Sequence, residues 1–334
     1  MINMILEQTS KQPHTGMLVA GAMELEKQGL LNLKIIESVE NKLDSAIGVT
    51  KVVINGSVCY FDYADGYSDC IELKKSLLKE ADFYFRRSYS DKYNSMLFSE
   101  FQNKIYPLGM NYYVYAQNQK ILFDNRPLWK RKLRKLLRYK EDNDFTIDIF
   151  EKKADYKKTN PTVLFYTRLW GEESEDNKID EMRINIIRAL KEKYGQLFRG
   201  GVYQNNISEK ICPDLIVSKK ETDRYTYIHN MKNSDICIGT MGLDESIGWK
   251  TAEYIAASRA IVHEKFHFFV PGGFCKEKNY LEFSSVEECL DNVQLLMDSP
   301  DLLYNMKKAN QKYYETWLRP DKQLWNALQI IINN

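Results

Sequence analysis

Two glutamates in the second half of the chain are separated by seven residues and could together hold a polar ligand. They are Glu245 and Glu253, within the segment DICIGTMGLDESIGWKTAEYIAASRAIV at positions 235–262. The apolar pattern of this segment predicts a strand, a loop with glycine, a helix and a second strand. Glu245 lies where the helix begins and can bind sugar hydroxyls. Glu253 lies two helical turns further on and can accept hydrogen bonds from ribose hydroxyls.

The loop before the predicted helix is suited to a phosphate group. Backbone N–H groups at the start of a helix bind phosphate oxygens, and a glycine such as Gly248 lets the backbone approach a ligand closely. The alternative is a solvated helix with two unrelated carboxylates, because this spacing alone is common on helix surfaces. We expect the loop and the first helical turn to contact a ligand through Gly242, Glu245, Ser246, Ile247, Gly248 and Trp249.

This segment resembles the C-terminal domain of GT-B glycosyltransferases, whose common pattern is E-G-F-G, then a glutamate-alanine pair, then a strand with Pro-Val-Val. Glu245, Gly248 and Glu253 match that pattern, and residues 260–262 stand where Pro-Val-Val is usual. The resemblance extends over most of residues 160–315. It implies two Rossmann-like domains, in which ligands bind outside the carboxyl ends of the strands.

The resemblance also implies a nucleotide diphosphate-sugar as the donor substrate. Arg168 follows the predicted strand Thr162–Thr167 and matches an arginine that neutralises the donor diphosphate. The lysine that usually follows this arginine is absent, so Lys219 or Lys220 would take its place. Glu245 would orient the donor sugar and, with Arg168, act in catalysis. Such enzymes normally bind the diphosphate without a metal ion, so we expect neither a metal nor another cofactor.

The loop after the first predicted strand contains His14-Thr15-Gly16. In GT-B enzymes this loop faces the cleft between the domains. The resemblance therefore implies that His14 lies on the acceptor side and that Gly16 lets the donor approach the backbone. The other interpretation is a simple turn in which Thr15 caps the following helix.

The motif Asp62-Tyr63-Ala64-Asp65-Gly66 places two carboxylates close together in the first half. It resembles a D-x-D metal site with one residue too many, and the other interpretation is a turn rich in Asp and Gly. A functional role would assign Asp62 to acceptor binding and Asp65 to the catalytic base. Arg86, which follows a later predicted strand, would contact an anionic acceptor or belong to an ordinary charged surface.

Residues 263–267 read His-Glu-Lys-Phe-His and match the H-E-x-x-H zinc motif. That motif requires a helix, which brings both histidines to one face. Residues 258–270 are instead rich in β-branched and aromatic side chains and precede Pro-Gly-Gly, a pattern that predicts a strand and then a loop. We therefore expect no zinc site, although His263 and Glu264 would lie near the donor in a GT-B fold.

Length and composition limit the class of protein. The 334 residues correspond to about two domains of ~150 residues each. The 47 basic residues balance 46 acidic ones, which argues against nucleic acid as a partner. There is no apolar run long enough for a transmembrane helix, and the N-terminus lacks the pattern of a secretory signal. The six cysteines form no C-x-x-C pair and indicate reduced core residues, so we expect a cytoplasmic protein.

Strand-length apolar runs alternate with amphipathic helical stretches in both halves, which predicts parallel sheets. We expect strands at Asn3–Glu7, Leu31–Ile36, Lys51–Asn55, Ala81–Phe85, Ile105–Pro107, Thr162–Thr167, Leu215–Val217, Asp235–Ile238 and Ala260–Val262, and helices at Thr15–Gln28, Glu72–Glu80, Lys178–Tyr194, Lys250–Ala257, Val286–Met297, Pro300–Tyr314 and Asp321–Ile332. The predicted fold is α/β of the GT-B type, with two Rossmann-like domains facing across a cleft. The acceptor-side domain is expected at 1–150, the donor domain at 155–315, and a helix returning to the first domain at 316–334.

Residues 126–140 predict a helix with eight basic residues around an apolar stripe. A basic amphipathic helix is suited to an anionic membrane surface. The alternative is a solvated helix whose leucines pack inward. Membrane binding would place the chain at the inner face of a membrane.

Taken together, these features predict transfer of a hexosyl or deoxyhexosyl group from a nucleotide diphosphate-sugar to a hydroxyl of a surface glycan or lipid-linked acceptor. The E-x7-E pattern favours the retaining families, but residues 249–262 also resemble inverting exostosin-like and fucosyl enzymes, so the stereochemistry stays open. Three other functions fit less well. They are a nucleotide-sugar epimerase on the same fold, a non-catalytic scaffold that binds nucleotide sugars, and a zinc hydrolase.

Overall fold

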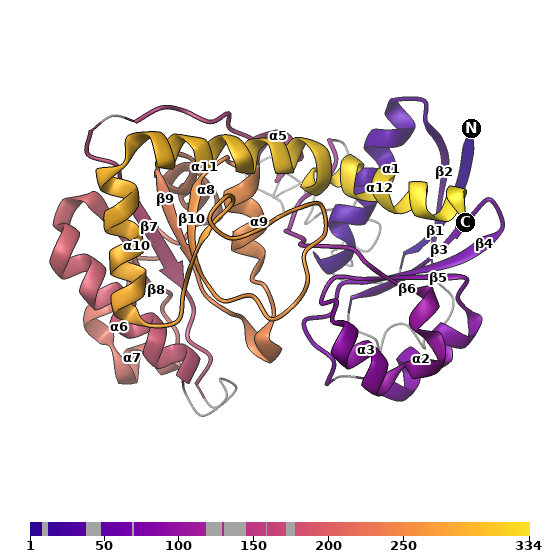
Figure 1. The fold of residues 1–334 in the computed structure, drawn as a ribbon, viewed down its shortest axis with the longest axis horizontal. Coiled ribbons are helices and arrows are strands. Elements are labelled where there is room, and N and C mark those ends of the chain that lie inside the picture. The colour runs from indigo at the N-terminus through magenta and orange to yellow at the C-terminus, as the bar shows by residue number, and fades with distance from the viewer. Residues whose placement is uncertain are drawn as a thin grey trace. The chain divides into compact units, whose positions relative to one another are not determined.

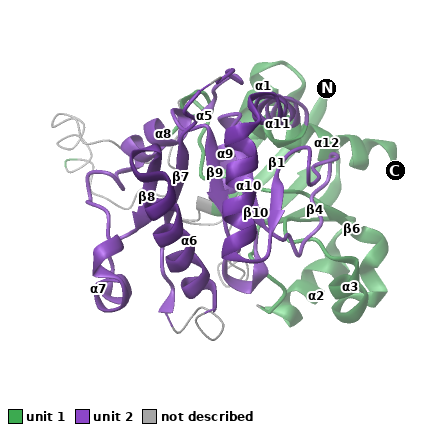
Figure 2. Cartoon of the chain, turned by 60° about the vertical axis from the view of Figure 1, so that its left-hand side comes forward, with its two compact units in different colours: residues 1–149, 317–334 green, residues 150–316 purple. Residues whose placement is uncertain are grey.

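The structure, a computed structural model, describes residues 1–8, 13–37, 48–68, 70–117, 129, 145–157, 159–171 and 178–334. The chain forms two compact units: unit 1 is residues 1–149 with 317–334, and unit 2 is residues 150–316 (Figure 2). Each unit has a central β-sheet with helices, so the predicted α/β class with two Rossmann-like units is confirmed. The basic stretch 126–140 lies outside the described residues, except for Trp129. Among the described helices, none is both long and apolar enough to cross a membrane.

Unit 1 contains a six-stranded sheet in the order β2-β1-β3-β4-β5-β6. Its strands are β1 (Ile2–Gln8), β2 (Leu31–Glu37), β3 (Val49–Ile54), β4 (Ser57–Asp62), β5 (Phe83–Arg86) and β6 (Ile105–Pro107). β3 runs antiparallel to both β1 and β4, whereas the other pairs are parallel. The sheet is mixed, rather than parallel as expected, because a hairpin joins β3 to β4. Asn55 and Gly56 form its two-residue turn, with left-handed φ angles of 50° and 97°.

The C-terminal helix packs in unit 1, against elements that are distant from it in the sequence. The helices of unit 1 are α1 (Gly16–Lys27), α2 (Ile71–Glu80), α3 (Asp91–Leu97) and α12 (Pro320–Asn333). α1 and α12 lie side by side (Figure 1), and Leu18 and Leu328 join one core with the sheet. Gly21 permits this close approach, because a Cβ there would lie 2.3 Å from the carbonyl oxygen of Pro320. The last helix thus returns to the N-terminal unit, as predicted.

Unit 2 contains a parallel five-stranded sheet in the order β11-β10-β9-β7-β8. Its strands are β7 (Val163–Thr167), β8 (Phe198–Val202), β9 (Ile236–Gly239), β10 (Ala260–Glu264) and β11 (Leu281–Phe283). Its helices are α6 (Lys178–Tyr194), α7 (Asn206–Ile211), α8 (Arg224–Lys232), α9 (Trp249–Ala256), α10 (Val286–Asp298) and α11 (Pro300–Tyr313), and the short α5 (Ile147–Phe150) spans the boundary between the units.

The order of strands in unit 2 creates a switch point between β7 and β9. From β7 the chain moves to β8 on one side, and it then returns to β9 on the other side of β7. In sheets of this kind, ligands bind in the crevice outside the carboxyl ends of the strands at the switch point. The fold alone therefore directs attention to the loops that follow β7 and β9.

One strand of unit 2 does not follow from the sequence pattern. β8 reads FRGGV, and two glycines weaken a strand pattern. Packing requires them, because a Cβ on Gly200 would lie 2.1 Å from the carbonyl oxygen of Phe165. The strand expected at 215–217 is instead a 3₁₀ turn, followed by a single β-bridge between Val202 and Ile216.

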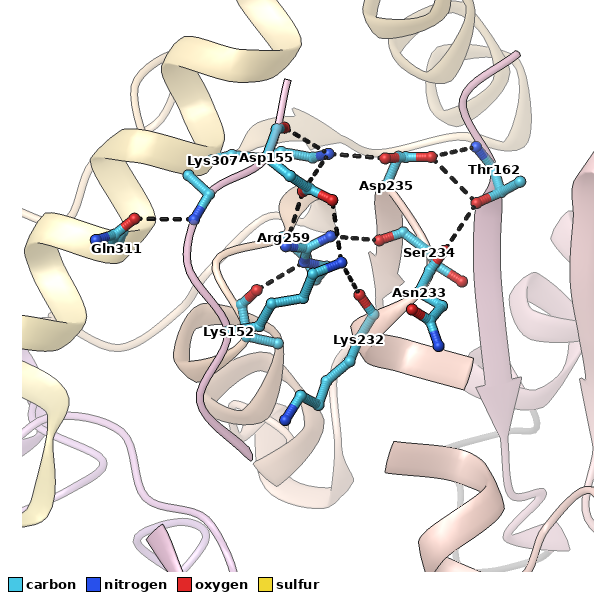
Figure 3. A network of polar contacts seen from close by, with 12 residues as sticks. Lys152, Asp155, Thr162, Lys232, Asn233, Ser234, Asp235, Arg259, Lys307 and Gln311 are labelled. Atoms are coloured by element: carbon cyan, nitrogen blue, oxygen red, sulfur yellow. Dashed lines mark hydrogen bonds and ion pairs between the residues drawn. The ribbon is translucent and has the colours of Figure 1, made fainter. Parts of the chain in front are cut away.

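A buried polar network fixes the opposite, amino ends of the strands in unit 2. Asp155 accepts hydrogen bonds from Lys152 and Lys307 and forms an ion pair with Arg259, whose side chain is fully buried (Figure 3). Burial alone would raise the pKa of Asp155, but Arg259, Lys152 and Lys307 hold it below its ordinary value. Lys307 also binds Asp235 at 2.7 Å, just before β9. The network ties the segment that enters unit 2 to its sheet.

Candidate functional site

A pocket of about 350 Å³ opens at the switch point of unit 2. Residues 165–168 line it from the end of β7, and residues 238–240 line it from the end of β9. The start of α9 forms a further wall. A volume of this size is within the usual range for small-molecule sites. The pocket therefore lies where the topology of the sheet predicts a ligand.

The pocket is lined by more positive than negative side chains. Arg168, Arg183, Arg224 and Lys250 line it together with one carboxylate, that of Glu253. The Glu253 side chain is almost completely buried and accepts hydrogen bonds from Arg224 Nη2 at 2.6 Å and from the Tyr227 hydroxyl at 2.8 Å. Since this pair neutralises itself, the remaining cations favour an anionic ligand.

Arg183, on α6, holds together the two loops that form the mouth of the pocket. Its guanidinium donates to Thr240 Oγ1 at 3.0 Å and to the carbonyl oxygens of Arg168 and Met241, both at 2.6 Å. The residue is buried, and burial lowers its pKa to about 10. Arg183 thus fixes the positions of the loops after β7 and β9.

Arg168 occupies the position that the sequence predicts, directly after β7. Its side chain is exposed, and its guanidinium lies 5.0 Å from the centre of the Trp170 ring, a cation–π contact. Only its backbone carbonyl is held by Arg183. The guanidinium can therefore turn toward an anion in the pocket without breaking the structure.

Lys250, at the start of α9, is a further cation of the pocket and is not among the site residues predicted from the sequence. Its Nζ donates to the Tyr166 carbonyl oxygen at 2.5 Å and lies 4.5 Å from the centre of the Tyr203 ring. Burial lowers its pKa to about 7. Its position in the first turn of the predicted helix, next to Trp249, is the sequence feature that could have indicated Lys250 as a ligand-binding residue.

The loop between β9 and α9 is tightly folded. Gly242 N donates to Ser246 O at 2.8 Å, and a Cβ on Gly242 would lie 2.6 Å from Ser246 Oγ. Ser246 and Ile247 are buried and are not among the residues that line the pocket. These two therefore shape the loop, whereas Gly242, Gly248 and Trp249 line the pocket.

Gly248 leaves free space at the start of α9. A Cβ built there would approach no heavy atom more closely than the Thr240 carbonyl oxygen, at 3.9 Å, and the backbone φ of −62° suits any residue. Packing within the protein therefore does not demand a glycine at this position. Gly248 is also one of the residues that line the pocket.

Glu245 lies in a second, adjoining pocket of about 240 Å³. Gly242 lines both pockets, and Glu264 lines the second. Glu245 Oε1 is 3.2 Å from His267 Nδ1, and Glu264 Oε2 accepts from the Met241 N–H at 2.8 Å. The two glutamates of the E-x7-E pattern therefore line neighbouring pockets rather than one. Lys219, by contrast, is exposed and lines neither.

Asp62 and Arg86 form a buried ion pair in unit 1, which corrects the expectation that they contact an acceptor. Their side chains are 0% and 1% exposed, and Arg86 Nη1 donates to Asp62 Oδ2 at 2.8 Å. Arg86 also donates to the carbonyl oxygens of Gly66 and Ser88. Burial raises the pKa of Asp62, but Arg86, Lys74 and the hydrogen bonds from Ala64 and Tyr84 together lower it by more. Both residues serve the fold, because no face of either is open to a ligand.

His14 and Asp65 do come together in unit 1. Asp65 Oδ1 lies 2.5 Å from Arg87 Nη1, and the charges of both residues act on the pKa of His14. Burial lowers the pKa of His14, Asp65 raises it and Arg87 lowers it, with a net decrease. Gly16 has a packing role, since a Cβ there would lie 3.0 Å from the Val114 carbonyl oxygen.

The H-E-x-x-H segment begins on a strand, as predicted. His263 belongs to β10, is buried and has both ring nitrogens engaged. Nδ1 donates to the Glu264 carbonyl oxygen at 2.6 Å, so Nε2 accepts from the Thr251 hydroxyl at 3.1 Å. Burial lowers the pKa of His263 to about 4. Across the described part of the chain, no three His, Cys, Asp or Glu side chains are grouped to hold a metal.

No protein-family model and no curated protein matches the sequence. Among solved structures, the chain is similar to the UDP co-structure of MnaA from S. aureus, at 12% identity and a TM-score of 0.48 over 100% of this chain and 97% of that one. It is also similar to UDP-GlcNAc 2-epimerase from Neisseria meningitidis bound to UDP-GlcNAc, at 12% identity and a TM-score of 0.45 over 99% of this chain and 100% of that one. A third similar structure is the C-terminal domain of the glycosyl transferase group 1 family protein LpcC from Francisella tularensis. Its identity is 13% and its TM-score 0.39, over 51% of this chain and 96% of that one. Likenesses of this degree do not indicate an activity for this chain.

Proposed function

We propose that the chain is a GT-B glycosyltransferase that moves a sugar from a nucleotide diphosphate-sugar to a hydroxyl of a glycan or lipid-linked acceptor. The observation that carries this proposal is the pocket at the switch point of unit 2. It combines an excess of cationic side chains with aromatic walls and a helix N-terminus. Cations and helix N–H groups suit a diphosphate, and aromatic rings suit a nucleotide base.

Each part of the donor has a matching part of the site. Arg168, Lys250 and the first turn of α9 would bind the diphosphate, and Glu253, which lines the same pocket, would accept a hydrogen bond from the ribose. The adjoining pocket, with Glu245, would hold the sugar. In the reaction, the bond from sugar C1 to the diphosphate oxygen breaks and C1 bonds to the acceptor oxygen. The cations stabilise the negative charge that appears on the departing diphosphate.

We assign the acceptor to unit 1, where His14 and Asp65 lie in the loops after β1 and β4. The acceptor hydroxyl must lose its proton during transfer. Because the pKa of His14 is below its ordinary value, its ring is neutral at pH 7 and can accept that proton. Asp65 beside it would stabilise the imidazolium that results.

An activity assay tests this function against its alternatives. Purified chain is incubated with UDP-glucose, UDP-N-acetylglucosamine, GDP-mannose and dTDP-rhamnose, with and without an extract of glycans and lipid-linked glycans. Release of nucleoside diphosphate that depends on the extract supports transfer. Isomerised donor without any acceptor would favour the epimerase, and binding without turnover over a broad acceptor panel would favour the scaffold.

We further propose that residues 126–140 bring the chain to an anionic membrane surface, where a lipid-linked acceptor would be present. The support is that these residues hold eight basic side chains and no acidic one, whereas the rest of the chain has 39 basic and 46 acidic residues. Each Lys or Arg near such a surface contributes about 1 kcal/mol. The chain should therefore sediment with anionic vesicles at low salt and be released at 1 M salt, where the screening length falls to ~3 Å. Equal sedimentation with neutral vesicles would refute a charge-driven contact.

A further inference from the structure

Lys250 is placed to bind a ligand anion directly. It is the second residue of α9, and its Nζ is held by the Tyr166 carbonyl and lies 4.5 Å from the Tyr203 ring centre and 5.5 Å from the Tyr227 ring centre. Among the residues that the structure describes, no carboxylate lies within ion-pair distance of this Nζ. The side chain therefore ends inside the pocket beside a carbonyl and aromatic faces, without a counter-ion.

The charged groups around Lys250 do not compensate for its charge. Glu253, on the same helix, favours the ammonium form but is already bound to Arg224 at 2.6 Å. Arg183 from α6 and Arg224 from α8 both oppose the ammonium form. The net result of burial and these neighbours is the pKa of about 7 for Lys250. The amine thus exchanges between neutral and charged forms near neutral pH.

We propose that Lys250 is a diphosphate-binding residue that takes up a proton from solvent when the ligand enters. This inference rests on the proposed function and deepens it. The neutral amine becomes an ammonium, and its new N–H bonds point to phosphate oxygens instead of the Tyr166 carbonyl alone. The negative charge of the diphosphate would offset burial and the two guanidiniums, which all oppose the ammonium form of Lys250. A ligand without phosphate, such as a free nucleoside, provides no reason for the proton to bind.

The consequence for specificity is that the site selects for phosphate charge as well as shape. When the bond to sugar C1 breaks, the diphosphate gains negative charge, and the ammonium of Lys250 stabilises it. When the nucleoside diphosphate leaves, the amine can return its proton to solvent.

Isothermal titration calorimetry can count the protons that accompany binding. A nucleotide sugar that binds is titrated into the native chain at pH 6 and pH 8, in HEPES or PIPES and in Tris, whose heats of ionisation differ. The diphosphate of a nucleotide sugar does not titrate in this range. Because Lys250 has a pKa of about 7, we expect uptake of most of one proton at pH 8 and of almost none at pH 6.

Three variants separate this role from a structural one. Lys250→Met should weaken nucleotide-sugar binding by more than tenfold and abolish the proton uptake. Without ligand, this variant should melt no lower than the native chain at pH 6, because a buried ammonium lowers the stability of the native chain at that pH. Lys250→Arg should retain most of the affinity without uptake. Lys191→Met, at an exposed position on α6, should retain both.

The results that would overturn the proposal are distinct from those against the function. Binding of a nucleotide sugar without proton uptake at pH 8, or uptake that persists in Lys250→Met, would refute the role of Lys250 and leave the proposed function intact. A lower melting temperature of unliganded Lys250→Met at pH 6 would assign Lys250 to the fold. If no nucleotide sugar binds the native chain, both the proposed function and this inference are wrong.

Discussion

Replacing Arg168 by methionine is expected to lower kcat/KM for sugar transfer by ~10²–10³-fold. The reason is that its guanidinium opposes the charge that develops on the departing diphosphate. The stability of the chain should change little, because the side chain is exposed and the structural contact with Arg183 uses the backbone carbonyl of Arg168. Initial rates at donor concentrations well below KM measure the effect.

A matched control for this variant is Arg188→Met on α6. Arg188 forms a surface ion pair with Asp214 at 3.6 Å, with both side chains about half exposed, and such pairs contribute at most about 1 kcal/mol. The Arg188→Met variant should therefore transfer sugar at the same rate as the native chain. If Arg168→Met transfers sugar as fast as this control does, the diphosphate is bound elsewhere.

Replacing Glu253 by alanine is expected to reduce the free energy of unfolding by about 3 kcal/mol. The change would leave the Arg224 guanidinium without its 2.6 Å partner and the Tyr227 hydroxyl without its acceptor. Urea unfolding at pH 7 measures the loss. Tyr227→Phe removes the hydrogen bond from the Tyr227 hydroxyl to Glu253 but keeps the ion pair with Arg224, and should cost about 1 kcal/mol.

Ligand affinity should be measured on Glu253→Gln, because the amide keeps an oxygen for Tyr227 and preserves the fold better than alanine does. Loss of a charge-assisted contact with ribose hydroxyls should weaken nucleotide-sugar binding by about 1.5–3 kcal/mol. A folded Gln variant with native affinity would show that Glu253 only supports Arg224. The ribose assignment would then be wrong, although the pocket could still bind the diphosphate.

Regular apolar patterns made much of the fold predictable. The helix expected at 178–194 and the strand expected at 105–107 match α6 and β6 residue for residue, because their apolar positions follow the period of the element. The segment around Glu245 likewise forms a strand, loop, helix and strand, namely β9, α9 and β10. By contrast, α8 is missing from the prediction, because its apolar residues form no clear stripe, although Asp223 caps it by accepting from the Thr226 N–H.

The composition of the site was less predictable than its location. Arg183, Arg224 and Lys250 come from three different helices, and only tertiary packing determines that their side chains meet at one pocket. Asp62 and Arg86 show the converse. Each follows the pattern of a functional residue after a strand, but they are adjacent in the sheet and neutralise each other in its interior. A single sequence does not reveal which charged residue will find such a partner.

The most direct test of the central claim is the binding of nucleotide sugars to the native chain and to Gly248→Ala, followed by thermal unfolding. A ligand at 100 times its Kd stabilises the folded state by about 2.7 kcal/mol, which should raise the Tm of a unit of this size by several degrees. We predict that at least one nucleotide sugar does so and that free glucose does not. Gly248→Ala should keep the native Tm, because the added methyl group meets no heavy atom closer than 3.9 Å, but should lose most of the shift, because it adds a methyl group to the lining of the pocket. If no nucleotide sugar at millimolar concentration raises the Tm, or if Gly248→Ala responds as the native chain does, the pocket at the switch point of unit 2 is not a nucleotide-sugar site.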